Sequence, residues 1–568
     1  MRRFPHNTPP LLVLLALGAS APVQARPFST YCHYAPLALS RQSTPMANAM
    51  VASALSRHAD LFLVGARGDS TRGPFAGAAH FLRLNPTTAA LATESSVFAS
   101  DPFDNDLFGF AVALSADVAV ISAPFDDDSY SSSGSVYVFA FDGVAWNQTQ
   151  KLVAPDPGPF HYFGQALALD ETHLLVGARQ ANGNAANSGA VYVFTRNTPA
   201  ATFTYTHKLS PAASAAVDNF GAAIALTAAH ALIGAPLRDD NFPNSGAAYI
   251  YNRNGPPGAP FVEHAKLLAD NPATGSNFGQ AVALQGDVAL IGAPSHNITT
   301  PAPAKPFAGS AYIFQRNATT DAWTLLKRLE SLAPLANERM GASVAIRLDS
   351  GANYLPAAAI GAPGAVGSST IPGAVYVFSL NPANSLWEQR WKLVAPTAAN
   401  NDTLAATVAF YEHLVIAGAP TNDTPASEGS PLKPDAGALF PFDLRPSMGR
   451  VDVNHDGIVN AADLELVTND FNWEGAKRAD LVPDLIVNFL DLLPFLDAYG
   501  QTGSNIPADF NRDGVVNFLD LVYMLSAFAR HHSHYLDPTT ATDINQNGIV
   551  DQADLTAVTN EQGLTCSQ

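Results

Sequence analysis

The stretch that decides the fold is Phe278-Gly-Gln-Ala-Val-Ala-Leu-Gln-Gly-Asp-Val-Ala-Leu-Ile-Gly-Ala-Pro294. It holds two short apolar runs on either side of Gln-Gly-Asp, a pattern typical of two β-strands joined by a tight turn. Its last tripeptide, Gly-Ala-Pro or a close variant, returns seven times along the chain. The copies start at Gly65, Ser122, Gly177, Gly234, Gly292, Gly361 and Gly418. An internal repeat of this kind determines the architecture of the whole chain.

The spacing of the copies identifies the repeating unit. Successive copies start 57, 55, 57, 58, 69 and 57 residues apart, which is the length of one four-stranded propeller blade with its loops. A Phe-Gly pair, or a variant of it, precedes most copies by 14 residues. The Phe position of this pair is held by Phe108, Phe163, Phe220, Phe278, Val51 and Leu404. Met340 holds it at an offset of 21, so the sixth repeat carries a seven-residue insertion.

Two further signals complete the repeat. Gly-x-x-Tyr-x-Phe or a variant follows most tripeptides by twelve residues, as at Gly134, and a Lys-Leu pair such as Lys151-Leu152 stands twelve residues before the next Phe-Gly position. Each repeat therefore predicts four short strands, and the seven repeats predict a seven-bladed β-propeller over residues 26–445. The last repeat ends near Phe442 without a Lys-Leu strand. We expect residues 34–40 to supply that strand and close the ring, which removes exposed sheet edges.

The paired motifs resemble the FG-GAP repeats of integrin-α-type β-propellers, over about residues 46–442. Many repeats of that family hold an Asp-rich calcium loop between the two halves of the motif. The segment from Phe163 to Arg179 has room only for a tight hairpin, so the chain resembles the short bacterial-type variant. The resemblance implies recognition of a ligand at the end of the ring where the blade loops converge. The irregular loops after Gly292, Gly361 and Gly418 would shape that face.

A second repeat begins beyond Arg445. Three 12-residue segments, starting at Asp452, Asp509 and Asp543, have Gly at position 6 and oxygen-bearing side chains at positions 1, 3, 5, 9 and 12. That is the donor set of an EF-hand calcium loop, in which position 7 contributes a backbone carbonyl. The predicted calcium ligands are Asp452, Asn454, Asp456, Ile458, Asn460, Asp463, Asp509, Asn511, Asp513, Val515, Asn517, Asp520, Asp543, Asn545, Asn547, Ile549, Asp551 and Asp554.

A fourth copy of the loop is degenerate. It keeps Asp480, Asp484, Asn488 and Asp491 at positions 1, 5, 9 and 12, but has Val482 and Leu485 at positions 3 and 6. Without these two residues we expect weak calcium binding or none.

The loops are followed by apolar residues at helical spacing. Leu492, Phe495, Leu496 and Tyr499 stand at i, i+3, i+4 and i+7, which predicts an amphipathic helix. The predicted fold class is therefore mainly β, a seven-bladed β-propeller followed by a small α-helical calcium-loop domain of the dockerin or EF-hand kind over residues 446–568. Little core is available in a module of this size, so calcium should contribute substantially to its folding.

The loop sequence Asp-x-Asn-x-Asp-Gly resembles the type I dockerin repeat, over about residues 450–562. The resemblance implies calcium as cofactor and attachment of a secreted protein to a cohesin-like module. Dockerins contact cohesin largely through loop positions 10 and 11, often Ser or Thr. These positions hold Ala461-Ala462, Phe518-Leu519 and Gln552-Ala553 in this chain.

Composition and the ends of the chain bear on the compartment. The 49 acidic and 30 basic residues argue against a nucleic-acid partner and suit divalent cations. Residues 1–25 predict a secretory signal peptide cut after Ala25, and no later stretch is long and apolar enough to span a bilayer. In an oxidising compartment Cys32 and Cys566 could pair; two unpaired thiols or an intermolecular bridge are the alternatives.

Three other features have a local explanation beside a functional one. Arg67-Gly68-Asp69 spells the integrin-ligand tripeptide, but it falls where the first tripeptide variant runs into its loop, so we expect coincidence. The acidic segments 126–128 and 238–240 could hold a cation or meet a ligand, or could be solvated loops. The histidines at 531, 532 and 534 have no partner at a metal-site spacing, which favours surface residues.

Two functional hypotheses follow. The first is a secreted calcium-binding protein whose propeller recognises an extracellular protein or polysaccharide ligand, or mediates adhesion, and whose tail anchors it to an extracellular or cell-surface partner. The alternative is a secreted polysaccharide-degrading enzyme, a glycoside hydrolase or lyase, or a component of a polysaccharide-degrading assembly. The sequence contains no nucleophile elbow, His-Glu-x-x-His helix or phosphate-binding Gly loop, so it predicts no catalytic residue.

Overall fold

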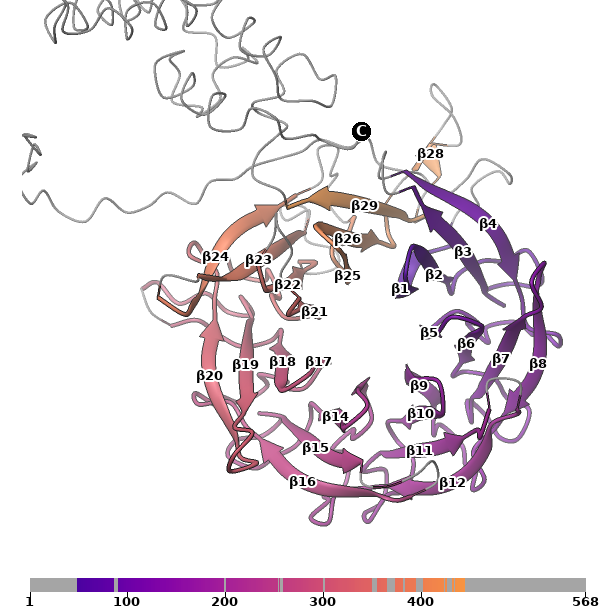
Figure 1. Cartoon of the computed structure of the whole chain (residues 1–568), viewed down its shortest axis with the longest axis horizontal. Coiled ribbons are helices and arrows are strands. Elements are labelled where there is room, and N and C mark those ends of the chain that lie inside the picture. The colour runs from indigo at the N-terminus through magenta and orange to yellow at the C-terminus, as the bar shows by residue number, and fades with distance from the viewer. Residues whose placement is uncertain are drawn as a thin grey trace, which may run out of the picture.

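The computed structural model describes residues 48–444, apart from 86–89, 199–200, 254, 256–258, 300–301, 350–354, 365–372, 382–383, 395–401, 423, 426–431 and 434. Seven antiparallel sheets stand in a ring, each with its first strand towards the centre and its last strand at the rim (Figure 1). The predicted seven-bladed β-propeller is confirmed. The predicted signal peptide, residues 34–40, Cys32, Cys566, the histidines at 531–534 and all four calcium-loop segments lie outside the described residues.

The strands follow the repeat in chain order. Blade 1 comprises β1 (Val51–His58), β2 (Leu61–Ala66), β3 (Ala78–Leu84) and β4 (Leu91–Val97); blade 2 comprises β5 (Val112–Leu114), β6 (Val118–Ala123), β7 (Ser135–Phe141) and β8 (Trp146–Leu152). Blade 3 comprises β9 (Phe163–Leu169), β10 (His173–Ala178), β11 (Ala190–Thr195) and β12 (Thr204–Leu209). Blade 4 comprises β13 (Ala223–Leu226), β14 (His230–Ala235), β15 (Ala247–Arg253) and β16 (Phe261–Leu267).

The remaining blades continue around the ring. Blade 5 comprises β17 (Ala281–Gln285), β18 (Val288–Ala293), β19 (Ser310–Arg316) and β20 (Trp323–Leu329). Blade 6 comprises β21 (Ser343–Arg347), β22 (Ala357–Ala362), β23 (Ala374–Asn381) and β24 (Leu386–Leu393). Blade 7 comprises β25 (Thr407–Tyr411), β26 (Leu414–Ala419) and β29 (Ala438–Asp443), and a separate hairpin of β27 (Thr424–Pro425) and β28 (Leu432–Lys433) extends from its loop.

The motif aromatics form the core of each blade. The phenylalanines of the Phe-Gly pairs are fully buried, and each contacts the motif Tyr of its own blade edge to face. The ring centroids lie 5.4 Å apart for Phe108 and Tyr137, and 5.2 Å apart for Phe278 and Tyr312. Such contacts combine burial of a large apolar area with favourable ring geometry. The Phe and Tyr that recur in the sequence are therefore packing partners.

The Phe-Gly and Gly-Ala-Pro halves meet through their glycines. The Gly279 amide donates to the Gly292 carbonyl of the same blade at 3.0 Å. The Gly279 carbonyl lies over Gly234 of the preceding blade, where an added Cβ would stand 1.9 Å from that oxygen. Only glycine allows the backbones of two blades to approach this closely.

A second backbone contact joins each pair of neighbours. The Phe278 amide donates to the Ser245 carbonyl at 3.1 Å, and Gly246 forms a parallel bridge with Phe278. Gly246 has φ +86° and a Cβ on it would lie 2.1 Å from the Phe278 carbonyl, so this position also requires glycine. The Gly of Gly-x-x-Tyr is thus an inter-blade contact, as are the glycines of the other two motifs.

Blade 7 and blade 1 close the ring through the same contacts. The Val51 amide donates to the Ala436 carbonyl at 3.1 Å, and Val51 pairs with Gly437. The Thr407 hydroxyl donates to the Ala52 carbonyl at 3.1 Å. Among the described residues blade 7 has three strands, and its completion by residues 34–40 stays a prediction. No helix in this described part is long and apolar enough to cross a membrane.

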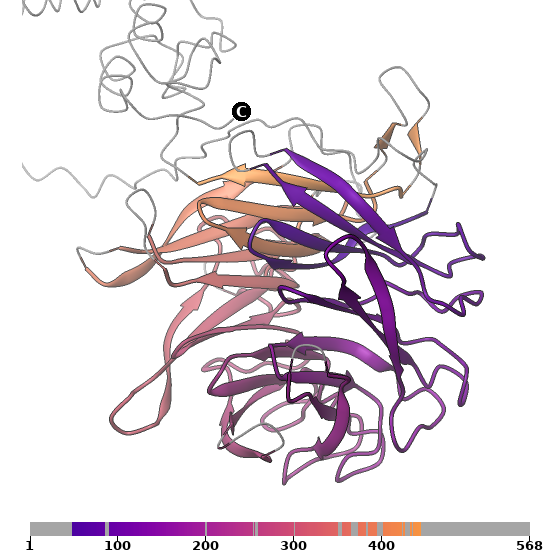
Figure 2. The same ribbon diagram turned by 45° about the vertical axis from the view of Figure 1, so that its right-hand side comes forward.

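The meander gives the ring two different ends. The crossover end carries the loops between second and third strands and the links between blades. The hairpin end carries the turns between first and second strands and between third and fourth strands (Figure 2). Every repeated motif lies at the crossover end, and the described chain leaves blade 7 at Leu444 on the hairpin end.

We predict that Gly234→Ala lowers the free energy of unfolding by about 2 kcal/mol or more, because its Cβ would overlap the Gly279 carbonyl. Gly275→Ala is the matched control: it has φ +73° but open space around its Cβ, so only about 1 kcal/mol of backbone strain is expected. Denaturant unfolding of both variants tests the difference. Equal losses would show that the close inter-blade approach is not what constrains Gly234.

Candidate functional site

A Tyr and a basic residue face each other at the crossover end of five blades. The third-strand Tyr pairs in register with a fourth-strand Lys or Arg. The pairs are Tyr137 with Lys151, Tyr192 with Lys208, Tyr249 with Lys266, Tyr312 with Arg328 and Tyr376 with Lys392. The recurring Lys of the sequence therefore lies beside the recurring Tyr, next to the loops that follow the tripeptides.

In blade 2 this pair holds the predicted acidic loop. Lys151 Nζ lies 3.0 Å from Asp126, 2.7 Å from Asp101 and in contact with Asp128. The Tyr137 hydroxyl donates to Asp126 at 2.9 Å, and Asp126 is only 2% exposed. Buried carboxylates of this kind are stabilised by their own cation. The segment 126–128 is thus an internal ion-pair network and not a uniformly solvated loop.

The acidic loop of blade 4 has the same character. Arg238 lies 2.8 Å from Asp218 and 3.1 Å from Asp240, and Lys266 lies 2.8 Å from Asp240. Throughout the described part of the chain, no three His, Cys, Asp or Glu side chains gather closely enough to hold a metal ion. Side-chain cations therefore lie against the carboxylates at the positions where the sequence suggested a cation site.

Two titratable groups near these networks are shifted by burial. Burial raises the pKa of Asp106 to about 7, and the nearby carboxylate of Asp126 adds to the effect. Burial lowers the pKa of His296 to about 4, and the ring lies 2.9 Å from Asn271 and 3.2 Å from Ser276. Both side chains are almost fully buried in the inter-blade contact, so their environment is explained by packing.

The crossover end exposes an unusual number of large apolar side chains. Seventeen large apolar residues are exposed in the described part of the chain. Ten of them lie on the loops and links of the crossover end, and two, Val144 and Leu355, lie on turns of the hairpin end. The ten are Phe75, Phe103, Tyr130, Val153, Phe160, Val217, Phe242, Phe307, Leu332 and Leu335. Gathered apolar exposure on one face is typical of an interaction surface.

Three of these phenylalanines also have a left-handed backbone. Phe75, Phe160 and Phe307 have φ of +52°, +59° and +51°. Most other repeats place a small residue in the same conformation. Asn187 and Asn244 occupy the position of Phe75 and Phe307; Asn48, Asn105 and Asn337 occupy that of Phe160, where Val217 is the one other bulky residue among the described repeats. Asn adopts this conformation easily, whereas a bulky residue there is strained. The signal is present in the sequence, because these positions stand two residues before the Gly of Gly-x-x-Tyr and three residues before the Phe of Phe-Gly, outside the motifs themselves.

A row of aromatic rings and arginines crosses the same end over blades 1 to 3. Phe125 lies 6.1 Å from Phe110 and 5.2 Å from Tyr162 between ring centroids. Arg67 lies over the Phe110 ring at 5.4 Å, and Arg179 lies over the Tyr162 ring at 5.0 Å. Neither guanidinium forms an ion pair within the described residues. The row therefore offers planar apolar faces and positive charge together.

The Arg-Gly-Asp tripeptide is part of this framework. Arg67 contacts Phe110, the Gly68 amide donates to the Ala49 carbonyl at 3.0 Å, and Asp69 is 8% exposed. A Cβ on Gly68 would lie 1.9 Å from the Asn48 carbonyl, so close packing explains the glycine. The tripeptide is not presented as an exposed loop.

The hairpin end also balances its charges internally. Asp60, Asp170 and Asp287 stand in tight turns between first and second strands. Each contacts an Arg at the end of a third strand: Arg83, Arg253 and Arg316 respectively. In these three turns a guanidinium group thus neutralises the carboxylate. The turns stand at the place where many integrin-α-type repeats hold a calcium loop.

Comparison with protein families agrees with both repeat assignments. The FG-GAP repeat matches residues 92–139, 146–194, 203–251 and 261–314, and the dockerin type I domain matches residues 507–561. Each FG-GAP match begins in or just before the fourth strand of one blade and ends in the third strand of the next, so it spans the inter-blade contact. The dockerin match contains the loops that start at Asp509 and Asp543, whereas those at Asp452 and Asp480 precede it.

Solved structures show only distant similarity. The periplasmic gluconolactonase PpgL of Pseudomonas aeruginosa is 12% identical with a TM-score of 0.40, covering 64% of this chain and 88% of its own. Sqt1 of Saccharomyces cerevisiae is 10% identical with a TM-score of 0.37, covering 74% and 87%. A protein from Lactobacillus plantarum is 13% identical with a TM-score of 0.43, covering 67% and 100%. No curated protein matches the chain.

We predict that Lys151→Met lowers the free energy of unfolding by about 3 kcal/mol, because it leaves the buried Asp126 carboxylate without its cation. Lys208→Met is the matched control at the same position of the next blade. Its partner Asp156 is 53% exposed, so a loss below about 1 kcal/mol is expected. Denaturant unfolding at pH 7 compares the two, and equal losses would contradict a structural role specific to the blade 2 network.

Proposed function

Because the chain joins an FG-GAP β-propeller to a dockerin type I domain, we propose that it is a calcium-binding recognition protein of an extracellular assembly. In this proposal the propeller binds an extracellular protein or polysaccharide through its crossover end. The dockerin domain anchors the chain to a cohesin-like module of an extracellular or cell-surface partner. FG-GAP propeller and dockerin modules are both typical of proteins that work outside the cell.

The observation that carries the proposal is the strained apolar set at the crossover end. Phe75, Phe160 and Phe307 are 37%, 52% and 45% exposed and occupy positions where Asn stands in other repeats. In the isolated protein these phenylalanines add backbone strain while leaving apolar area in water. Binding of a partner would bury that area, so their presence is explained by recognition better than by stability.

The arginine and aromatic row supports the same face. Arg67 and Arg179 flank Phe110, Phe125 and Tyr162 without a carboxylate neighbour, although the chain as a whole carries a net charge of −19. Aromatic rings beside unpaired guanidinium groups can bind planar, acidic or ring-bearing partners. We therefore place the binding surface across the crossover end, with its centre on blades 1 to 3.

The proposed calcium sites are in the tail. Dockerin type I domains normally bind calcium, and the loops at Asp509 and Asp543 within the matched region contain the oxygen donors that calcium prefers. Asn and Asp side chains at positions 1, 3, 5, 9 and 12 would hold the ion, with the Val515 and Ile549 carbonyls at position 7. The bound calcium would order these loops, so the attachment domain would fold only in its presence.

We predict that the triple variant Phe75→Asn, Phe160→Asn and Phe307→Asn is more stable than the wild type. Each change should contribute on the order of 1 kcal/mol, because Asn relieves the left-handed strain. Phe103→Asn is the control, since Phe103 is 72% exposed but has no positive φ and should gain nothing. Thermal unfolding tests this part.

The same triple variant tests the binding face. The probes are cellulose, chitin, xylan, fibronectin and collagen, each presented as a surface to the calcium-loaded full chain. We expect the triple variant to lose at least about tenfold in retention on whichever surface holds the wild type. Equal retention of the wild type and the triple variant would contradict the assigned face. Release of new sugar ends by the wild type would show that the protein is an enzyme and not only a recognition protein.

We predict that Asp452→Ala, Asp509→Ala and Asp543→Ala together abolish the calcium-induced gain of helical signal of the full chain, because each removes the first ligand of a loop. Circular dichroism with calcium and with a chelator measures the gain. The propeller signal at β wavelengths is the internal control. An unchanged calcium response in the triple variant would disprove the loop assignment.

A further inference from the structure

At the hairpin end, side chains cross from one blade to the next at most described interfaces. Arg196 of blade 3 reaches Asp117 of blade 2 at 3.7 Å, and Arg253 of blade 4 binds Asp170 and Thr172 of blade 3. Blades 5 and 6 are joined where the Leu348 amide donates to Gln285 at 2.9 Å. These contacts fill the space between the inner strands of neighbouring blades.

The interface of blades 4 and 5 lacks an arginine of this kind that crosses it. His264 of blade 4 contacts the Asp321 carbonyl of blade 5 at 2.8 Å instead, and the His230 ring packs edge to face against Trp323. Arg316 of blade 5 occupies the repeat position of Arg196 and Arg253, each seven residues after a motif Gly. The position that holds Asp117 in blade 2, five residues before the tripeptide, is Ala229 in blade 4, and an alanine, Ala228, precedes it. Arg316 therefore has no carboxylate partner at these positions of blade 4, and it binds carboxylates of its own blade.

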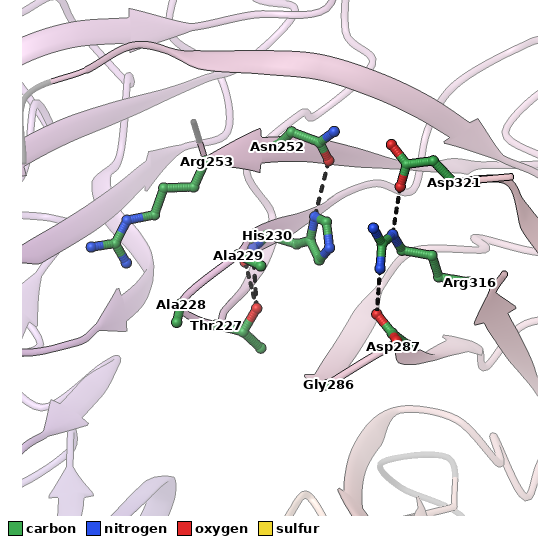
Figure 3. A pocket seen from close by; sticks show the side chains of 10 residues that line it. All are labelled: Thr227, Ala228, Ala229, His230, Asn252, Arg253, Gly286, Asp287, Arg316 and Asp321. Atoms are coloured by element: carbon green, nitrogen blue, oxygen red, sulfur yellow. Dashed lines mark hydrogen bonds and ion pairs between the residues drawn. The ribbon is translucent and has the colours of Figure 1, made fainter. Parts of the chain in front are cut away.

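Arg316 is held there by two carboxylates. Its Nη1 lies 2.9 Å from Asp287 and its Nε lies 2.5 Å from Asp321. A cavity of about 550 Å³ opens between the two blades as a result (Figure 3). That volume is within the range of small-molecule sites, about 300–1,000 Å³. Blade 4 thus has neither of the acids that meet this arginine at the two preceding interfaces, since Thr227 stands at the position of Asp170 and Ala229 at that of Asp117.

The lining of the cavity is polar. Seven of the ten lining residues carry polar side chains, and only Ala228 and Ala229 carry apolar ones. The ring Nδ1 of His230 lies 2.9 Å from the side-chain oxygen Oδ1 of Asn252, as Figure 3 shows. Because an oxygen acceptor faces Nδ1, the neutral ring has its proton there and Nε2 is an acceptor. The Asn252 amide group remains as a donor.

The charged groups of the lining are already paired. Arg316 binds Asp287 and Asp321 of its own blade, and Arg253 binds Asp170 of blade 3. A charged ligand would have to compete with these ion pairs, whereas a neutral ligand would not. Hydroxyl groups both donate and accept, so they match a wall on which amide, guanidinium, imidazole and carboxylate groups alternate.

We propose that this cavity, lined by His230, Asn252, Asp287 and Arg316 between blades 4 and 5, binds a neutral sugar residue of a glycan. The site is at the opposite end of the ring from the crossover face and does not depend on the proposal made for that face. Substitution of Phe75, Phe160 and Phe307 leaves the cavity intact, so the two assignments fail independently.

Ala229→Asp tests the proposal by restoring the acid that blade 2 has at this position. The new carboxylate would draw Arg316 across the interface and close the cavity. Ala116→Asp is the matched control, because it adds the same charge to an exposed turn residue of blade 2 at the same end of the ring. Ala228→Phe, which fills the cavity without adding charge, is a second variant in case Ala229→Asp does not fold.

The measurement is saturation-transfer NMR on the full chain with neutral monosaccharides, namely glucose, galactose, mannose and xylose, and their methyl glycosides. Glucuronate and glucosamine are the charged comparisons. We expect transfer to at least one neutral sugar, with at least about tenfold weaker binding by Ala229→Asp or Ala228→Phe, the effect of losing one or two hydrogen bonds. Ala116→Asp should bind as the wild type does.

Each other outcome overturns the proposal. Absence of transfer to every neutral sugar, preference for glucuronate or glucosamine, or equal binding by the wild type and a folded cavity-filling variant would each exclude this site. Within a positive result, methyl glycosides that bind as well as free sugars indicate a unit of a glycan chain. Binding of the free reducing sugar alone would exclude a glycan and would indicate that the ligand is a soluble monosaccharide.

Discussion

The propeller depends on one close contact. The carbonyl oxygen of the Gly in each Phe-Gly pair packs against the tripeptide glycine of the preceding blade. At Gly234, Gly177 and Gly292 the carbonyl of the next blade stands about 2 Å from where a Cβ would be. The carbonyl of the tripeptide glycine also accepts a hydrogen bond within its own blade; that of Gly234 accepts from the Gly221 amide. Each motif is therefore shared by two blades. Blade geometry and ring geometry are therefore set together, and seven copies close a ring without a dedicated closing element among the described residues.

This constraint explains why the two ends of the ring differ in their freedom to vary. The crossover end carries the glycines and buried Phe residues of the motif. Motif positions there accept only buried or small replacements such as Met340 and Ser122, whereas large exposed residues such as Phe75 and Phe307 stand on the loops. The hairpin end makes its inter-blade contacts through side chains such as Arg253, and one substitution can open or close an interface. The close backbone contacts keep the ring intact while such interfaces change.

The repeat predicted the propeller because period and glycine chemistry are both local properties of the chain. It also placed the acidic segments correctly beside the tripeptides, but the meaning of those segments depended on Lys151 and Arg238, whose proximity arises only when third and fourth strands pair. The cavity between blades 4 and 5 was equally hidden. It opens where blade 4 has Thr227 and Ala229 in place of the acids of blades 3 and 2, and the rotamer that Arg316 adopts there cannot be derived from spacing.

Departures from the repeat are more informative about function than its consensus. A residue that recurs in most blades is required by the contact that recurs with it, so Phe278, Gly292 and Tyr312 are explained by packing alone. Phe160 at a position of Asn, and Ala229 at a position of Asp, have no such explanation, since each removes a favourable local interaction. Because the blades share one structure, equivalent positions can be compared between them. A residue that departs from its equivalents at a cost in stability points to selection for binding.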